Sequence, residues 1–85
     1  MSETSGDRPR RVPPYMEAAR ELADEIRAGR YDDGTSFPSE TQLTARFGMA
    51  RMTVRRALGV LQEAGLITTR WGKGSAVVPP DQRPN

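Results

Sequence analysis

The sequence predicts a small α+β domain that is mainly helical, with three helices followed by one antiparallel β-hairpin. Three observations predict it: apolar residues recur at helical spacing in three segments, a serine cap and glycines divide these segments, and an alternating stretch ends in Gly-Lys-Gly. A chain of 85 residues is long enough for one such domain with a modest core. This order of elements is typical of a winged helix-turn-helix, in which the hairpin forms the wing.

The first helix is predicted from Pro14 to about Ala28. Proline is tolerated in the first turn of a helix, and Gly29 provides a stop. Acidic side chains lie mostly on the other face of this helix, so we expect its role to be structural rather than DNA-binding. Its inward face is formed by apolar residues at helical spacing, which are Tyr15, Ala19, Leu22, Ala23 and Ile26.

The second helix is predicted from Glu40 to Phe47. Ser39 followed by Gln42 matches a capping box, in which a hydroxyl and a side-chain amide bond the free amides at the helix start. Gly48 ends the helix and begins a short turn. Before the cap, residues 35–37 have the pattern of a short strand.

The third helix is predicted from about residue 51 to residue 64. Gly65 closes it as a glycine C-cap. Gly59 is unusual, because a glycine inside a helix costs about 1 kcal/mol relative to alanine. The inward stripe consists of Val54, Ala57, Leu58 and Leu61, and the other face carries Arg51, Met52, Arg55 and Arg56.

A β-hairpin is predicted after the third helix. Residues 67–71 alternate as a half-buried strand does, and residues 75–78 pair back. Gly72-Lys73-Gly74 forms the tip, since glycines adopt the positive φ angles that a tight reversal needs. We interpret Trp71 as a packing anchor at the base of the wing.

The two ends of the chain lack the apolar pattern of the centre. Residues 1–12 have no apolar periodicity, and residues 79–85 are polar and rich in proline. We therefore predict a disordered N-terminal tail over 1–12, a winged helix-turn-helix domain over 13–78, and a disordered C-terminal tail or linker over 79–85.

The composition excludes several classes of function. The sequence has no cysteine and no histidine, so cysteine or histidine nucleophiles, triads and metal sites are excluded. The carboxylates show no paired acid–base arrangement, so we expect no enzyme, no cofactor and no bound metal. No stretch approaches the roughly 20 apolar residues of a membrane span, and we expect a cytoplasmic, nucleoid-associated protein.

The charge is unevenly distributed along the chain. The net charge is only +2, from 13 basic and 11 acidic residues. Acidic residues dominate from Glu17 to Glu40, whereas from Thr41 to Val78 the only acidic residue is Glu63. This asymmetry predicts one acidic side and one basic side, as a nucleic-acid-binding domain has.

The third helix and the wing supply the candidate DNA-binding residues. With Val54 facing inward, Arg51 and Arg55 lie on one exposed strip, from which arginine can donate two hydrogen bonds to guanine. Thr53 and Arg56 are placed to meet phosphates, as are the amides at the helix start. The other candidates are basic side chains or points of close backbone approach, which are Arg46, Arg70, Gly72 and Lys73.

These residues, from Tyr15 to about Val78, resemble the N-terminal DNA-binding domain of GntR-family bacterial transcription regulators. The resemblance implies a sequence-specific regulator, which we expect to be a repressor, bound as a dimer to an inverted-repeat operator in double-stranded DNA. It also adds Ser39 and Thr41, at the start of the second helix, to the candidate contacts. The matched segments are Phe37-Pro38-Ser39-Glu40, Phe47-Gly48, Arg51, Thr53 to Leu58, Leu61, Glu63 to Ile67 and Gly72-Lys73-Gly74.

The chain departs from the family pattern at three positions. Thr41 stands where many members carry arginine, which weakens or removes one groove contact. Ala50 replaces the usual serine or threonine before the third helix, and losing such a cap typically costs about 1 kcal/mol. Met52 replaces a common small polar residue, so the preferred DNA sequence is expected to be unusual.

Members of the family normally continue into a C-terminal domain that binds a metabolite and supplies a dimer interface. This chain is therefore either one domain of such a regulator or a minimal regulator, and we expect no small-molecule ligand in residues 1–85. The alternative function is a winged helix that binds another protein and no DNA. An RNA-binding variant is disfavoured because surface aromatics are scarce.

Overall fold

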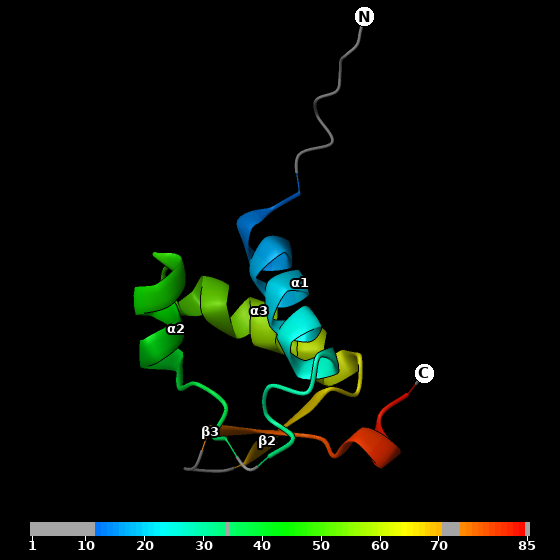
Figure 1. Cartoon of the computed structure of the whole chain (residues 1–85). Helices are drawn as coiled ribbons and strands as arrows, with labels where there is room; N and C mark the ends of the chain where they lie inside the picture. Colours follow the sequence, from blue (N-terminus) through cyan, green and yellow to red (C-terminus); the bar gives the residue numbers. More distant parts are fainter. Residues whose placement is uncertain (1–11, 34, 71–73, 85) are drawn as a thin grey trace, which may run out of the picture.

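The computed structural model describes residues 12–33, 35–70 and 74–84, and Arg70 for its backbone only. Within these residues the predicted fold class is confirmed, because the helices precede a two-stranded antiparallel sheet (Figure 1). The elements in chain order are α1 (Pro14–Arg27), α2 (Glu40–Phe47), α3 (Arg51–Glu63), β2 (Ile67–Arg70), β3 (Gly74–Val77) and a short 3-10 helix η2 (Pro80–Gln82).

The helices enclose one apolar core. Figure 1 shows α1 crossing in front of α3, with α2 at one end of α3 and the hairpin below them. The inward stripes of α1 and α3 meet in this crossing, and β2 adds Ile67 to the core. The largest fully buried side chains are Leu22, Ile26, Leu43, Leu61, Leu66 and Ile67.

The hairpin has a simple antiparallel register. Ile67 pairs with Val77, and Arg70 pairs with Gly74 through the backbone. Ile67 is buried under the helices, whereas the residues of β3 are half-buried or exposed. The core therefore holds the hairpin at Ile67, whereas Thr69 and Gly74, further along the two strands, are exposed.

Residues 35–37 form no strand, so the short strand expected there is wrong. The Asp33 carboxylate explains the difference, because its Oδ1 accepts from both the amide and the hydroxyl of Thr35, at 3.1 and 2.6 Å. The Thr35 amide, which could otherwise pair with an adjacent strand, is thus hydrogen-bonded within a turn. Phe37 instead packs edge-on against Tyr31, with ring centroids 5.3 Å apart.

The C-terminal residues differ from the disordered tail or linker that the sequence predicts. Residues 80–82 form η2, and Arg83 folds back onto the rest of the domain. Its guanidinium donates to the carbonyls of Val78 (2.8 Å) and Ile26 (3.2 Å) and pairs with Asp32. Only 10 % of the Arg83 side chain is exposed, so Arg83 itself packs against the domain, whereas residues 79–82 and 84 are exposed. The predicted N-terminal tail, apart from Val12, lies outside the described residues.

Candidate nucleic-acid interface

Helix α2 has the predicted caps at both of its ends. Ser39 and Gln42 form a complete capping box, with Gln42 N bonded to Ser39 Oγ at 3.1 Å and Ser39 N bonded to Gln42 Oε1 at 2.8 Å. Gly48 has a φ of 65°, which glycine adopts at little cost, and its amide caps the end of α2. Ala50 offers no side-chain cap to α3, so the first-turn amides of α3 face outward without a side-chain partner in the described residues.

Helix α3 separates an apolar face from a basic face. Its buried residues are Val54, Ala57 and Leu61, as predicted, and Leu58 is half-buried against the core. The first turn points its basic groups to solvent, with the side chains of Arg51 and Arg55 56 % and 53 % exposed. The packing of α3 therefore places these two arginines on one outward strip.

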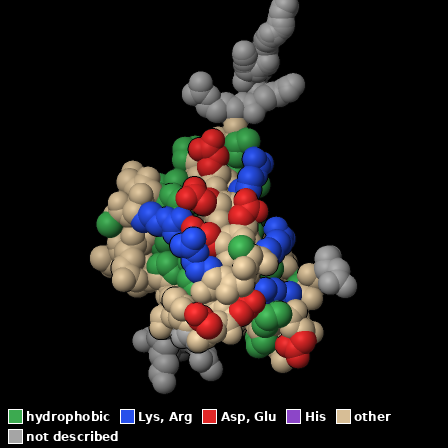
Figure 2. Space-filling model, viewed as in Figure 1, with side chains coloured by type: hydrophobic (Ala, Val, Ile, Leu, Met, Phe, Trp, Pro, Cys, Tyr) green, Lys and Arg blue, Asp and Glu red, His purple; other side chains and the backbone are tan. Residues whose placement is uncertain are grey.

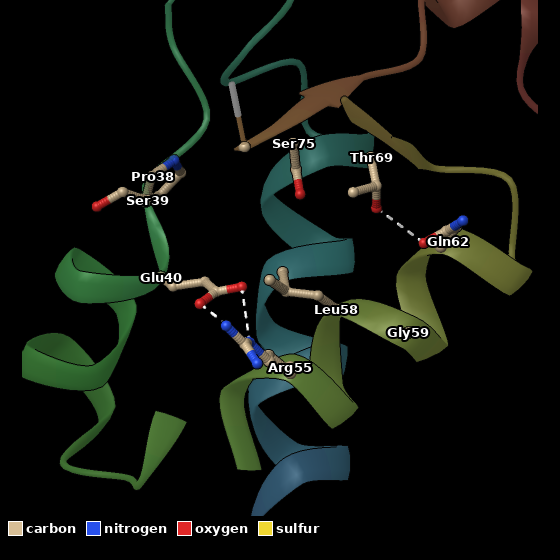
Figure 3. A pocket seen from close by; sticks show the side chains of 10 residues that line it. Pro38, Ser39, Glu40, Arg55, Leu58, Gly59, Gln62, Thr69 and Ser75 are labelled. Atoms are coloured by element: carbon tan, nitrogen blue, oxygen red, sulfur yellow. Dashed lines mark hydrogen bonds and ion pairs between the residues drawn. The ribbon is translucent and has the colours of Figure 1, made fainter. Parts of the chain in front are cut away.

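Glu40 holds this strip in place from the start of α2. Arg55 Nε donates to both Glu40 oxygens at 3.2 Å, and Arg51 Nη1 lies 3.8 Å from Glu40 Oε1 (Figure 3). An exposed ion pair of this kind is worth at most about 1 kcal/mol, so its main effect is on orientation. Among the described residues, the terminal nitrogens of Arg55 make no hydrogen bond, which leaves its two-pronged edge available to a ligand.

A groove runs beside Arg55 between α2, α3 and the wing. It has a volume of about 490 Å³, and Figure 3 shows Glu40 and Arg55 on one side and Thr69 and Ser75 on the other. Thr69 Oγ1 donates to Gln62 Oε1 at 2.9 Å, which ties the wing to α3. The groove is lined by Pro38, Ser39, Glu40, Arg55, Leu58, Gly59, Gln62, Thr69, Gly74 and Ser75.

Arg46 does not join this surface. It pairs with Glu21 (3.0 Å) and with Glu25 of α1, and its guanidinium stacks 4.8 Å from the Phe47 ring. The bond from Arg46 lowers the pKa of Glu25, and the Tyr31 hydroxyl adds a second bond at 3.0 Å. Arg46 therefore joins α2 to α1, and the DNA contact predicted for it stays a prediction.

The α1 side of the molecule is mixed in charge rather than purely acidic. Figure 2 shows Asp and Glu side chains alternating with Lys and Arg side chains over α1. The reason is that α1 carries exposed arginines of its own, Arg20 and Arg27, and receives Arg46 from α2. The predicted separation into an acidic and a basic side is therefore only partial on this face.

Arg56 and Thr53 flank the outward strip. The Arg56 guanidinium lies 4.5 Å from the centre of the Tyr15 ring, a cation–π contact that directs it toward the start of α1. Thr53 is half-buried and lines a shallow hollow of about 390 Å³ together with Met52, Arg55 and Arg56. The structure thus brings the four predicted α3 positions, Arg51, Thr53, Arg55 and Arg56, onto one turn-and-a-half of helix.

The remaining predicted positions are less fully described. Thr41 is exposed in the first turn of α2, where its carbonyl accepts from the Thr44 hydroxyl at 2.7 Å. Ser39 is exposed beside it, in the capping box. Gly72, Lys73, Trp71 and the side chain of Arg70 lie outside the described residues, so their predicted roles in the wing stay predictions.

The sequence alone does not predict that Glu40 belongs to the site. In the sequence Glu40 is only an acidic residue within a family match, yet in the structure it accepts hydrogen bonds from Arg55 and forms an ion pair with Arg51. Its position directly after an N-cap, with two arginines following at 51 and 55, is the signal that was available. Tyr31, outside this site, is buried, and its hydroxyl donates a hydrogen bond to Glu25. In the described part of the chain, the acidic side chains form no cluster that could bind a metal ion. The helices described there also lack the length and apolar composition of a membrane span.

Comparison with known proteins identifies similar sequences. The model of the family described as bacterial regulatory proteins, gntR family, matches residues 14–77. The chain is 38 % identical over 68 residues to the HTH-type transcriptional regulator TreR of Bacillus subtilis, covering 80 % of this chain and 29 % of TreR. It is 36 % identical over 74 residues to the histidine utilization repressor of Klebsiella aerogenes, covering 85 % of this chain and 31 % of that protein. The chain thus spans less than a third of the length of these relatives.

Solved structures show the same fold. The DNA-binding domain of AraR in complex with operator ORR3 has a TM-score of 0.78 at 27 % identity, covering 92 % of both chains. The N-terminal domain of AraR in complex with mutant ORR3 has a TM-score of 0.73 at 31 % identity, covering 80 % of this chain and 97 % of the other. The two AraR structures therefore share the fold of this chain over 80 % and 92 % of its length.

Proposed function

We propose, since the chain belongs to the gntR family of bacterial regulatory proteins, that it binds double-stranded DNA sequence-specifically and regulates transcription. The observation that carries the proposal is the outward strip of α3, where Arg51 and Arg55 are both held by Glu40. In helix-turn-helix proteins the N-terminal residues of the second helix of the motif contact base edges in the major groove. Here that helix is α3, and its first turn presents the two arginines.

Arg55 is the better placed of the two to read a base. Its Nε is occupied by Glu40, so its free edge is the pair of terminal nitrogens, which match the O6 and N7 acceptors of guanine. Arg51 sits at the first position of the helix and reaches either a base or a phosphate. Because α3 has no side-chain cap, its first amides and Thr53 are available to a phosphate oxygen.

Contacts on either side of α3 complete the proposed interface. Arg56, Ser39 and Thr41 are assigned to phosphates that border the groove, and Arg46 is removed from the contact set because α1 occupies it. In the wing, Gly72, Lys73 and Arg70 are assigned to the backbone or the minor groove from the sequence alone. Phosphate contacts orient the protein and base contacts specify the sequence.

The wider biology is part of the same proposal. A domain over residues 13–84 binds one half of an inverted repeat, and a homodimer on DNA binds both halves. The names of similar proteins favour a repressor, because two of them are called repressors, the histidine utilization repressor and NagR of Bacillus subtilis. Binding to the chromosome would place the protein at the nucleoid in the cytoplasm. No catalytic step is assigned to it.

Selection from random duplexes, read out by sequencing, tests the proposal. The chain should enrich one motif, in two inverted copies if a dimer binds. Arg55→Ala should weaken binding to the selected duplex by about 1–3 kcal/mol and relax base preference at one position. Arg20→Ala removes an exposed arginine from α1 and serves as the control, with unchanged base preference. No enriched motif, or equal losses in both variants, would refute sequence-specific reading by α3.

The rival function, a winged helix that binds only protein, predicts apolar residues exposed on α3. Among the described residues of α3, Met52 is the one large hydrophobic residue that is exposed. One such side chain surrounded by arginines is a poor protein-binding patch, because interfaces of this kind are depleted of charge at their centre. The geometry therefore favours DNA.

A further inference from the structure

Met52 is exposed to a degree that the fold does not explain. The residue is 71 % exposed, and within the described part of the chain it is the large hydrophobic residue that is exposed to solvent. It lies in the first turn of α3, in the hollow of about 390 Å³ that it shares with Thr53, Arg55 and Arg56. Since it contributes little to the core, its apolar surface is available to a partner.

The helical geometry places Met52 at the centre of the outward face. At about 100° per residue, its direction is nearly opposite the mean direction of the buried Val54, Ala57 and Leu61. Arg55 and Arg56, three and four residues further on, lie to either side of it. Whatever the arginines bind in front of α3 must therefore pass directly over the Met52 thioether.

We propose that Met52 is a specificity-determining residue that recognises thymine through its 5-methyl group. The inference rests on the proposed function, because it assumes that the face around Arg55 enters the major groove. In that groove the other base-edge groups are hydrogen-bond donors and acceptors, and the thymine methyl is the apolar one. A thioether has no strong donor or acceptor, and its soft, adaptable chain suits contact with a methyl group.

The two flanking arginines predict where in the half-site this thymine lies. Arg55 is oriented by Glu40 toward the groove between α3 and the wing, whereas Arg56 is directed toward Tyr15 and α1. Met52 lies between the two, so the thymine should be adjacent to the base pair that Arg55 reads. The selected half-site is expected to contain that thymine, on either strand, next to the position at which Arg55→Ala relaxes preference.

Replacing thymine by uracil removes only the methyl group and provides the test. Each thymine of the selected duplex is replaced in turn, and binding is measured for the parent chain, Met52→Gln and Met52→Leu. The parent should lose about threefold to fourfold in affinity at one thymine per half-site, which corresponds to one buried methyl group. Met52→Gln, of similar length but polar, should be indifferent to that replacement, and Met52→Leu should keep part of the discrimination. Circular dichroism of each variant verifies that α3 is intact.

The outcomes separate this inference from the proposed function. A parent chain that selects a motif and depends on Arg55, but is indifferent to uracil everywhere, retains the function and overturns the role of Met52. The same conclusion follows if Met52→Gln discriminates as the parent does, or if the half-site has no thymine beside the Arg55 position. If no duplex is selected, the proposed function fails, and the Met52 inference fails with it.

Discussion

Arg55 of α3 donates its Nε hydrogen to both carboxylate oxygens of Glu40, which is the first residue of α2. The bond crosses the helix-turn-helix motif from the start of one helix to the first turn of the next. It holds the arginine side chain at its Nε, and the terminal nitrogens make no hydrogen bond within the described residues (Figure 3). Glu40 thus acts as a positioning residue, and its negative charge also opposes the phosphates.

Replacing Glu40 separates these two effects. Glu40→Gln should reduce the ratio of specific to non-specific DNA affinity, because the arginines lose their common anchor while one repulsive charge disappears. Titration of the selected duplex and of a scrambled duplex at the same salt concentration measures that ratio. Glu63→Gln removes the same charge from the exposed far end of α3 and should leave the ratio unchanged. A ratio that falls equally in both variants would contradict a positioning role for Glu40.

Gly59 lies seven residues after Met52, on the same outward line of α3. A Cβ added there meets nothing within 4 Å, so Gly59→Ala should raise the free energy of unfolding by about 1 kcal/mol. It should also weaken operator binding, because the added methyl group occupies the face that approaches DNA. Thermal unfolding and duplex titration measure the two effects.

Gly65 offers the contrasting substitution. It has a φ of 77°, and a Cβ there would lie 2.7 Å from Pro84 Cγ, so Gly65→Ala should destabilise the fold. For Gly59→Ala, the contradicting result is a variant that is more stable than the parent but binds the operator equally tightly. That result would show that DNA does not contact this line of α3.

The Arg46–Glu25 pair predicts a specific acid sensitivity. Because the bond from Arg46 lowers the pKa of Glu25 below its ordinary value of 4.5, the pair stabilises the folded state above that value. The stabilisation should be lost as the pH falls through the lowered pKa in the folded state. Chemical unfolding at a series of pH values should therefore show a steeper acid decline for the parent than for Glu25→Gln. Parallel declines would show that the pair contributes nothing to stability.

Arg83 is expected to stabilise the domain because it joins the C-terminal residues to the end of α1 and the turn that follows it. Its guanidinium bonds two carbonyls and one carboxylate, and a hydrogen bond to a charged group is worth about 1.5–3 kcal/mol. Arg83→Ala and Asp32→Ala should each destabilise, and the double variant should cost less than the sum of the two. Arg30→Ala, at an exposed neighbouring position, is the control. Full additivity in this double-mutant cycle would contradict a direct contact.

Local signals explain how much of the fold could be predicted. Ser39 and Gln42 carry the capping box within four consecutive residues, and Gly48 needs only its own backbone freedom to end α2. The stripe of Val54, Ala57 and Leu61 sets the buried face of α3, so the exposure of Arg51 and Arg55 follows directly. These features depend on neighbours along the chain, which periodicity and capping rules describe well.

Contacts between distant segments could not be predicted in this way. Arg46 meets Glu25 across 21 positions, and Arg83 meets Ile26 across 57. Which arginine finds a carboxylate depends on the crossing of the helices, and no local pattern encodes that crossing. For this reason the sequence alone predicts neither the bond between Arg46 and Glu25 nor the bond between Arg83 and Ile26.

Amide chemical shifts during titration with the selected duplex test the central claim most directly. The claim is that the first turn of α3, with Arg55 oriented by Glu40, is the surface that meets the bases. The largest perturbations should fall on residues 51–56 and on the start of α2, and they should be much smaller along the exposed face of α1. Perturbations concentrated on α1, with residues 51–56 unmoved, would contradict the account.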